Sequence, residues 1–275
     1  MSNSKIVISG GLGFIGTEVA KLLVSQNRHA TLFDNLSPQI HGTNPDLSSL
    51  PLLNSVNVDF IRGDVRRPQD WEAVLGDADC VVHLAAETGT AQSMYEISRY
   101  TETNVGGTAV LLDHLANHKH KVRKIILASS RSVYGEGAYH CPSCGVVFPS
   151  MRSLQILQRQ QWEPACPACK GGISATATRE DARRSPSSIY AATKLAQEGL
   201  VRIAGQALGI PTVIFRLQNV YGEGQSLRNP YTGILSIFSN QIRQGKARSS
   251  IYMRTARKAG TLYMFQMLHE QLFLE

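Results

Sequence analysis

A tyrosine and a lysine in the second half of the chain are spaced for proton transfer. Tyr190-Ala-Ala-Thr-Lys194 places a phenol and an ammonium four residues apart, on one face of a helix. A phenol with its ordinary pKa of about 10 is a poor base at neutral pH, and a nearby cation favours the phenolate. This spacing alone also arises by chance. Here Ala128-Ser-Ser-Arg-Ser-Val-Tyr-Gly135 supplies hydroxyls after an apolar run, so the two segments together predict a general-base site.

A glycine-rich loop near the N-terminus predicts a site for a dinucleotide. Gly10-Gly-Leu-Gly-Phe-Ile-Gly16 joins a strand-like apolar run to a stretch with helical spacing. Gly10, Gly13 and Gly16 allow a tight turn, close approach of the backbone to a pyrophosphate, and packing of the helix on the strand. The start of the helix, with Phe14 and Ile15, then offers N–H groups and partial positive charge to the phosphates.

Two acidic residues follow the next strand-like runs. Asp34 lies 18 residues beyond Gly16, where a carboxylate binds the ribose hydroxyls of adenosine and repels a 2′-phosphate, so NAD is favoured over NADP. Asp34-Asn35 can equally be the start of a turn. Asp64-Val65 lies where the edge of the adenine would bind, and Asp64 can equally cap a helix near Pro68. The sequence leaves both alternatives open.

Four of the five cysteines form two Cys-x-x-Cys pairs. A gap of 21 residues separates Cys141 and Cys144 from Cys166 and Cys169. Four thiolates in this pattern suit a tetrahedral zinc ion, although the gap slightly exceeds the usual range, and a site with no open position is structural. The pattern predicts a zinc-ribbon-like insertion at residues 137–178. The fifth cysteine, Cys80, is expected to be a small buried apolar residue.

The elements that must position these residues alternate between strand and helix. Short apolar runs are followed by stretches with helical spacing, such as residues 188–208, which carry Tyr190. This order predicts an α/β Rossmann fold, a doubly wound parallel sheet that binds ligands at the carboxyl ends of its strands. Residues 1–215 would form this domain, and residues 216–275 part of a substrate-binding domain. The predicted strands are residues 5–9, 29–33, 58–61, 80–84, 124–128 and 211–215.

The composition is typical of a globular protein, with 43% hydrophobic and 18% charged residues among 275. The sequence has neither the pattern of a signal peptide nor an apolar run of the ~18 residues needed to span a bilayer, which predicts a cytoplasmic protein outside membranes. The net charge of +7 comes mainly from scattered basic residues. The scattered charge therefore argues against nucleic-acid binding, and a basic cleft suits a diphosphate substrate at least as well.

Taken together, these motifs resemble the extended short-chain dehydrogenases/reductases, specifically the NAD-dependent nucleotide-sugar epimerases and dehydratases. The resemblance covers residues 5 to about 247 and includes seven motifs in order. These are the glycine loop, Asp64-Val65, His83-Leu-Ala-Ala86, Asn104, the serine segment, Tyr190 with Lys194, and Arg216-Leu-Gln-Asn-Val-Tyr-Gly222.

The resemblance implies roles for further residues. Ser130, and not Ser129, would be the catalytic serine, and Asn219 would bind the substrate together with Ser130. A homodimer is also implied. The resemblance also implies a set of residues that contact the cofactor, most of which follow the ends of predicted strands. These are Gly10, Gly13, Phe14, Ile15, Gly16, Asp34, Asn35, Asp64, Val65, Leu84, Ala85, Ala86, Asn104, Tyr190 and Lys194.

The resemblance further implies a reaction through a transient 4-keto sugar. Tyr190 would take the proton of a sugar hydroxyl as hydride passes to the nicotinamide, while Ser130 binds the same oxygen and Lys194 binds the nicotinamide ribose. Dehydratases of this family carry an Asp-Glu pair directly after the catalytic serine, where this chain has Arg131-Ser132. Neither residue can perform the acid–base chemistry of dehydration, so a nucleotide-sugar 4-epimerase is predicted.

Other functions remain open on the sequence. A nucleotide-sugar 4-ketoreductase or dehydrogenase would use the same catalytic residues, and a non-catalytic dinucleotide- or nucleic-acid-binding protein would use the zinc ribbon. The insertion resembles those of a bacterial subgroup that includes dTDP-L-rhamnose 4-epimerase, which suggests dTDP-L-rhamnose and dTDP-6-deoxy-L-talose as substrates. Because the insertion starts just after Tyr134-Gly135, we expect a lid or specificity loop pinned by zinc.

The C-terminal part departs from the family pattern after Gly245-Lys246. The family continues with an acidic strand and Arg-Asp-Phe-Val-Tyr-Val-x-Asp-Val, whereas this chain reads Met253-Arg-Thr-Ala-Arg-Lys-Ala-Gly260. Codons for this segment, regrouped one base earlier, can encode the family sequence. We therefore expect a one-base frameshift near residues 247–252, followed by an aberrant tail at residues 248–275. An incomplete substrate-binding domain would weaken the activity or abolish it.

Overall fold

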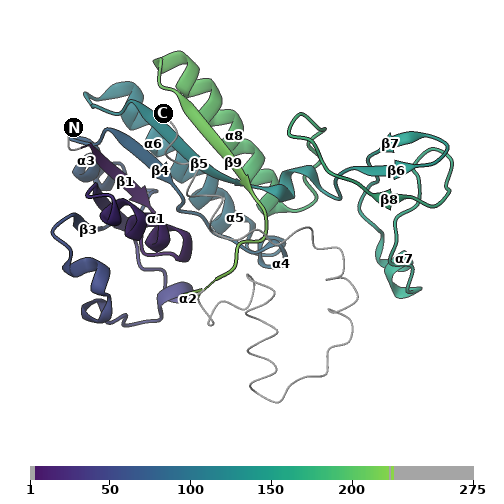
Figure 1. Cartoon of the computed structure of the whole chain (residues 1–275), viewed down its shortest axis with the longest axis horizontal. Coiled ribbons are helices and arrows are strands. Elements are labelled where there is room, and N and C mark those ends of the chain that lie inside the picture. Colours follow the sequence, from purple (N-terminus) through teal and green to yellow (C-terminus); the bar gives the residue numbers. More distant parts are fainter. Residues whose placement is uncertain (1–3, 223, 226–275) are drawn as a thin grey trace.

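The computed structural model describes residues 4–222 and 224–225. Its largest element is a sheet of six parallel strands in the order β3-β2-β1-β4-β5-β9 (Figure 1). The strand order reverses between β1 and β4, so the sheet is doubly wound and the predicted Rossmann fold is confirmed. The strands are β1 (Lys5–Ser9), β2 (His29–Asp34), β3 (Val58–Arg62), β4 (Cys80–His83), β5 (Lys124–Ser130) and β9 (Thr212–Leu217).

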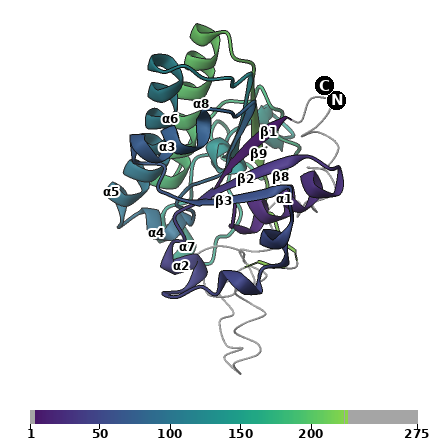
Figure 2. The ribbon, with the colours of Figure 1, turned by 90° about the vertical axis from the view of Figure 1, so that its left-hand side faces the viewer.

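Helices cover both faces of this sheet because strand residues alternate between two cores. Val7 and Val81 belong to the core beneath α3, α6 and α8, whereas Ile8 and Val82 belong to the opposite core, beneath α1. Figure 2 shows the sheet between these layers. The helices are α1 (Phe14–Ser25), α2 (Pro38–His41), α3 (Pro68–Leu75), α4 (Thr90–Ser93), α5 (Ile97–Tyr100), α6 (Gly107–Asn117) and α8 (Ile189–Leu208).

The helical stretch at residues 97–117 is interrupted. α5 ends at Tyr100, a π-helical turn spans Thr101–Gly106, and α6 follows. A side chain at Gly107 would approach the Val65 side chain to 2.6 Å, so the helix passes close to the loop after β3. The π turn places Asn104 in the interior, where it is fully buried. Single π turns of this kind often occur near functional sites.

The long helix α8 has a cap at each end, which explains its agreement with the predicted range of residues 188–208. The Ser188 hydroxyl accepts a hydrogen bond from the N–H of Ala191 at 3.1 Å. At the other end Gly209 is left-handed, with φ +67°, and terminates the helix. Between these caps, Tyr190 and Lys194 lie one turn apart and face β5.

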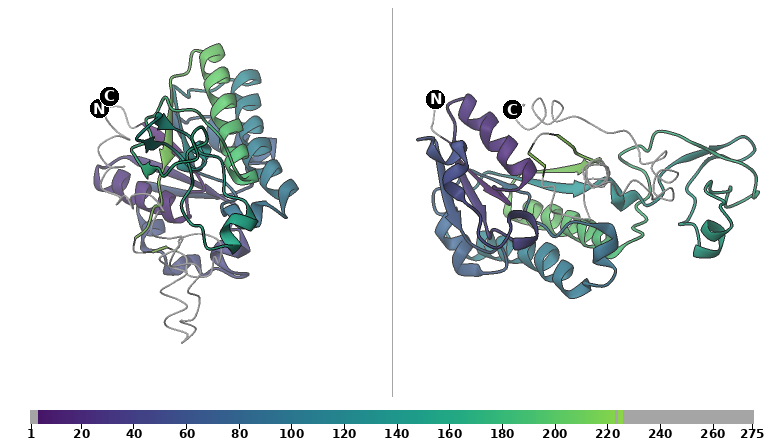
Figure 3. Two further views of the ribbon diagram at one scale, coloured as in Figure 1. Left: turned by 90° about the vertical axis from the view of Figure 1, so that its right-hand side faces the viewer. Right: turned by 90° about the horizontal axis from the view of Figure 1, so that it is seen from below.

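The insertion at residues 137–178 forms a separate lobe, which we call the cysteine module. Three short antiparallel strands lie in the order β7-β6-β8, and a short helix, α7 (Leu154–Gln158), joins the two cysteine pairs. The strands are β6 (Tyr139–Cys141), β7 (Gly145–Val147) and β8 (Ser174–Ala175). The module projects sideways from the main sheet, on the side of β5 and β9 (Figures 1 and 3).

Several sequence predictions concern residues outside the described range. These are most of the partial substrate-binding domain at residues 216–275, the frameshift near residues 247–252 and the aberrant tail at residues 248–275. Among the helices that the structure does describe, none combines the length and the apolar character needed to cross a bilayer.

Candidate active site

A cavity of about 1870 Å³ extends along the carboxyl ends of the strands. This volume exceeds the ~300–1,000 Å³ typical of a pocket for one small ligand, so it has room for a dinucleotide beside a second molecule. Asp64 and Asn104 do not line it. The predicted site residues that do are Gly10, Gly13, Phe14, Ile15, Gly16, Asp34, Asn35, Val65, Leu84, Ala85, Ala86, Ser130, Tyr190, Lys194 and Asn219.

The glycine loop forms one wall of the cavity, and its geometry requires glycine. Gly10 has φ +69°, and a Cβ there would lie 2.9 Å from the backbone nitrogen of Ala85, on the opposite wall. A Cβ at Gly16 would overlap the carbonyl oxygen of Gly10. Helix α1 begins at Phe14; the residue at its N-cap, Gly13, provides no side-chain cap, and the first turn has no acidic residue. The cradle therefore suits a phosphate group.

Asp34 ends β2 and holds both the glycine loop and the loop that follows β2. Its carboxylate accepts hydrogen bonds from the N–H of Leu12, at 3.1 Å, and of Leu36, at 2.8 Å. The bond to Leu36 forms the turn that the alternative interpretation anticipated, while Asp34 also lines the cavity. His41 Nε2 lies 3.7 Å from the same carboxylate. The two interpretations of Asp34 are thus compatible.

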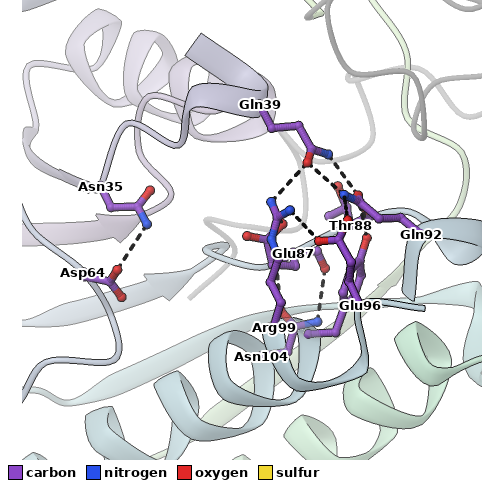
Figure 4. A network of polar contacts seen from close by, with 10 residues as sticks. Asn35, Gln39, Asp64, Glu87, Thr88, Gln92, Glu96, Arg99 and Asn104 are labelled. Atoms are coloured by element: carbon purple, nitrogen blue, oxygen red, sulfur yellow. Dashed lines mark hydrogen bonds and ion pairs between the residues drawn. The ribbon is translucent and has the colours of Figure 1, made fainter. Parts of the chain in front are cut away.

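Asp64 is engaged with protein groups. Arg66 donates to both carboxylate oxygens, at 2.9 and 2.7 Å, and Asn35 donates to one of them at 3.3 Å (Figure 4). The hydrogen bond from Arg66 is the main reason why the pKa of Asp64 falls to about 2. Asp64 does not cap α3, because the cap position is Arg67 and has no side-chain hydrogen bond.

Asn104 acts on the loop that forms the second wall. Its amide accepts a hydrogen bond from the N–H of Glu87, at 2.8 Å, and donates to the Glu87 carbonyl, at 3.1 Å. It also donates to the Thr193 hydroxyl on α8, at 3.0 Å. Asn104 therefore ties the loop after β4 to the helix that carries Tyr190 and Lys194.

Ser130, Tyr190 and Lys194 meet at one end of the cavity. Ser130 ends β5, and its hydroxyl forms hydrogen bonds with Tyr190 and Ser132. Lys194 is buried and donates to the Ala128 carbonyl at 2.9 Å. The backbone N–H of Tyr190 donates to the Ser93 hydroxyl at 3.0 Å, which fixes the first turn of α8. The spacing predicted from the sequence thus produces a shared site.

The pKa values of this site differ from the expectation that Lys194 would lower the pKa of Tyr190. Burial raises the pKa of Tyr190, and the hydrogen bond with Ser130 only partly opposes this effect. Burial also lowers the pKa of Lys194 to about 7. The physical reason is that both groups lie in a pocket with little water, where each charged form is penalised. Ser130 is therefore the neighbour that favours the phenolate.

The two serines of the predicted segment have different partners. The Ser129 hydroxyl donates to Glu198 at 2.6 Å, and Glu198 also accepts two hydrogen bonds from Arg216, at 2.9 and 2.8 Å. Burial would raise the pKa of Glu198, but the bonds from Arg216 and Ser129 together lower it. Glu198 was missed from the sequence, although it lies four residues after Lys194, on the same face of α8.

Arg216 extends this contact to both ends of the insertion. It donates to the Tyr134 hydroxyl, at 2.6 Å, and to the Glu180 carbonyl, at 2.7 Å. Its guanidinium also lies 5.0 Å from the centre of the Tyr134 ring. The chain thus enters and leaves the insertion beside the strand that carries Ser130.

The four cysteines of the module converge as predicted. Their sulfur atoms all lie within 4.8 Å of one another, and the Cys141 and Cys169 sulfurs are 3.5 Å apart. A tetrahedral zinc ion with Zn–S bonds of about 2.3 Å requires sulfur atoms about 3.8 Å apart, whereas a disulfide requires about 2.05 Å. The donor set and its spacing therefore fit a metal ion. Cys80, by contrast, lies in β4 and packs against apolar residues, but it is only partly buried, whereas a buried residue was expected.

The lid predicted from the insertion is not apparent in this arrangement. Most of the module projects to one side of the main sheet (Figure 3). Among its described residues, Met151 alone lines the cavity. The role of the module as a lid or specificity loop stays a prediction.

Comparison with protein families gives a match to the "NAD dependent epimerase/dehydratase family" over residues 6–146 and 166–260. The matched region omits residues 147–165, in the middle of the cysteine module. It extends past residue 248, into the segment assigned above to a shifted reading frame, so the frameshift also stays a prediction.

Several relatives are nucleotide-sugar epimerases. The dTDP-L-rhamnose 4-epimerase of Burkholderia thailandensis is 39% identical over 249 residues, which are 90% of this chain and 66% of that protein. The UDP-glucose 4-epimerase of Neisseria gonorrhoeae is 32% identical over 136 residues, 48% of this chain and 38% of that protein. The chain thus spans less than two thirds of the length of these relatives.

Solved structures of nucleotide-sugar 4-epimerases are also similar to this chain. The UDP-N-acetylglucosamine 4-epimerase of Methanobrevibacter ruminantium, in complex with UDP-N-acetylmuramic acid, has a TM-score of 0.66 at 27% identity and covers 90% of this chain and 64% of its own. The UDP-glucuronic acid 4-epimerase of Bacillus cereus, with UDP-glucuronic acid and NAD, has a TM-score of 0.64 at 26% identity and covers 88% and 64%. With the family match across most of its length, the chain belongs to the NAD-dependent epimerase/dehydratase family.

Proposed function

We propose that this chain provides the catalytic part of an NAD-dependent nucleotide-sugar 4-epimerase. The observation that carries the proposal is the meeting of Ser130, Tyr190 and Lys194 at one end of a cavity that the glycine loop also lines. The similarity to 4-epimerases of known substrates supports it.

The residues around the cavity fit NAD. The cradle at Gly10, Gly13 and Gly16 would hold the pyrophosphate, and Asp34 would bind the adenosine ribose and disfavour a 2′-phosphate. Held there, NAD would supply the hydride acceptor and donor that inversion of a sugar carbon requires. Asn104 does not line the cavity, but it would hold this site in place through its hydrogen bonds with Glu87 and Thr193.

Tyr190 would act as the base that takes the proton of the sugar hydroxyl, and as the acid that returns it. Ser130 would bind the same oxygen and share the negative charge that develops there. Lys194, held by the Ala128 carbonyl, would bind the nicotinamide ribose. A proton relay built on a buried phenol works in both directions, which an epimerase requires.

Arg131 and Ser132 favour epimerisation over dehydration. The Arg131 guanidinium donates to the Gly135 carbonyl at 2.9 Å, and the Ser132 hydroxyl donates to Ser130 at 2.9 Å. Neither position offers a carboxyl group next to the catalytic serine. Loss of water from the sugar would need such an acid–base pair.

The proposed substrates are dTDP-L-rhamnose and dTDP-6-deoxy-L-talose, supported by the 39% identical relative. The test is incubation of the chain, and of the protein encoded by the corrected reading frame, with NAD and dTDP-, UDP- or GDP-sugars, followed by NMR of the sugar. Inversion at C4 without net NADH is expected. Release of NADH with an oxidised sugar would instead assign a dehydrogenase, and salt-dependent DNA or RNA binding without epimerisation would assign the non-catalytic alternative.

Zinc in the cysteine module is the second part of the proposal. Cys141, Cys144, Cys166 and Cys169 would bind the ion as thiolates and leave no open position, so its role would be structural. Backbone turns support the geometry, since Gly145, after the first pair, and Lys170, after the second, both have positive φ angles. Metal analysis of the purified chain tests this assignment.

A homodimer is the third part of the proposal. Exposed apolar side chains lie on α5 and α8, which contact each other, and include Ile97 and Ile203, with 50% and 60% of their surface exposed. Exposed apolar side chains suit association with a second copy. Sedimentation of the chain, and of an Ile203→Glu variant, tests whether α8 takes part in a dimer.

A further inference from the structure

A polar network joins the two walls of the cavity. Gln39, on α2, and Gln92, on α4, exchange two amide hydrogen bonds of 3.0 Å each (Figure 4). The Arg99 guanidinium, on α5, donates to the Gln39 side-chain oxygen at 3.1 Å. These contacts connect the segment after β2 to the segment after β4. We call them the Gln39 clasp.

The partners of Gln39 are held in place by other residues. Gln92 is 2% exposed, and its amide also contacts the Tyr100 hydroxyl, at 3.1 Å, and the Glu96 carboxylate, at 3.0 Å. Arg99 forms ion pairs with Glu87, at 2.8 Å, and with Glu96, at 2.7 Å. This side of the clasp is therefore ordered before Gln39 binds to it, which lowers the entropy cost of closure.

The clasp lies where a bound dinucleotide would be enclosed. Gln39 itself lines the cavity, as do Asp34 on the same wall and Glu87 and Thr88 on the other. Gln39 extends from α2 across to α4 and α5 (Figure 4). Separating the two walls requires these hydrogen bonds to break.

The same short helix connects the clasp to the catalytic tyrosine. Gln92 and Ser93 are neighbours on α4, and Ser93 accepts the hydrogen bond from the N–H of Tyr190. The Tyr100 ring, whose hydroxyl contacts Gln92, packs edge-on against Tyr190 at 6.5 Å between ring centres. A movement of α4 that opened the clasp would therefore also disturb the start of α8.

We infer that the Gln39 clasp closes the cofactor cavity and slows the exchange of bound NAD. The inference rests on the proposed function, and it deepens it. An epimerase must return to the sugar the hydride that it removed, so the reduced cofactor has to stay bound between the two half-reactions. Hydrogen bonds that hold the walls together contribute directly to this retention.

The test compares cofactor release from the full chain and from two variants at Gln39. Gln39→Ala removes the amide and its bulk, whereas Gln39→Met keeps a side chain of similar length without the hydrogen bonds. Each protein is loaded with radiolabelled NAD, diluted into excess unlabelled NAD and sampled over time. Gln69→Ala, on the exposed surface of α3, is the matched control. The readout requires no catalytic turnover.

Loss of two to three hydrogen bonds is expected to accelerate release about 10- to 100-fold in both variants, and to leave Gln69→Ala unchanged. Release from Gln39→Met at the rate of the unaltered chain would overturn the inference, because the amide would then have no role. Unchanged release from Gln39→Ala would do the same while leaving the proposed function intact. If the unaltered chain binds no NAD, the proposed function fails and the inference fails with it.

Discussion

The main sheet and the cysteine module reach a defined structure by different means. The sheet is covered on both faces by apolar cores, whose fully buried members include Trp71, Leu23 and Ile125. The core of the module consists of Tyr139, Cys141, Val147 and Cys166, with Ile173 packed against them. Two of its four buried members are therefore the predicted metal ligands themselves.

This difference indicates which part of the molecule needs a bound metal ion in order to fold. A large apolar core stabilises a domain without help, whereas a segment of about 40 residues usually requires a metal or disulfides. The catalytic residues lie on the sheet and its helices, so they are supported by the larger cores. We therefore expect the fold of the module to depend on bound metal. Substitutions at the cavity should instead affect the activity of the domain built on the sheet.

The largest expected effect is loss of the module fold on removal of zinc. Cys144→Ser should abolish metal binding, because a closed site needs all four thiolates, and binding to such sites is worth on the order of 10 kcal/mol. Limited proteolysis should then cleave residues 137–178, while NAD still binds to the remaining domain. Cys80→Ser, in the main sheet, is the matched control and should keep its zinc. A protease-resistant module in Cys144→Ser would show that both regions fold by apolar burial alone.

A substitution at Tyr190 should instead reduce the activity and leave the module folded. Tyr190→Phe keeps the ring and removes the phenol, so epimerisation should fall by roughly 10²- to 10⁴-fold while NAD binding and the zinc content are retained. Rates are measured by NMR of the sugar. The same substitution in the module, Tyr139→Phe, should keep activity near that of the unaltered protein. Equal losses in both variants would mean that the two regions do not divide their roles as proposed.

Arg216 connects the two regions, and its replacement should weaken both. Lysine cannot form the two bonds to Glu198 and those to Tyr134 and Glu180 at once. Arg216→Lys is therefore expected to lower the free energy of unfolding by about 2–3 kcal/mol, measured in urea. Arg202→Lys, on the exposed side of α8, should stay within about 0.5 kcal/mol of the unaltered chain. Equal free energies of unfolding in these two variants would show that the buried Arg216–Glu198 pair does not stabilise the fold.

The smallest effect concerns pH. Burial lowers the pKa of Lys194 from 10.5 to about 7, so between these values the unfolded chain binds more protons than the native chain. Stability should therefore rise with pH through this window, and the penalty is fully present below pH 7. Lys194→Met removes the penalty along with the hydrogen bond to Ala128. We expect the variant to be more stable by roughly 2 kcal/mol at pH 6, with a difference that shrinks towards pH 10.

Urea unfolding at several pH values measures this difference. Lys119→Met, at an exposed position, is the control and should show no such dependence. A gap between Lys194→Met and the unaltered chain that does not change with pH would contradict the lowered pKa.

Features that depend on local geometry could be predicted from the sequence. The helical period places Tyr190 and Lys194 on one face, the glycine loop marks the turn between β1 and α1, and each Cys-x-x-Cys pair specifies a ligand turn. Alternation of strands and helices was sufficient for the parallel sheet. These features follow from dihedral preferences and from spacing within a few residues, so one sequence is enough to predict them.

Contacts between distant parts of the chain, and the different partners of adjacent residues, became visible only in the folded structure. Ser129 and Ser130 are adjacent, yet one contacts Glu198 and the other Tyr190. Asp64 is paired with Arg66, and Asn104 is buried behind the cavity wall. The Gln39 clasp joins residues that are 53 positions apart. No local pattern encodes such contacts, because they depend on how loops and helices pack at the edge of the completed sheet.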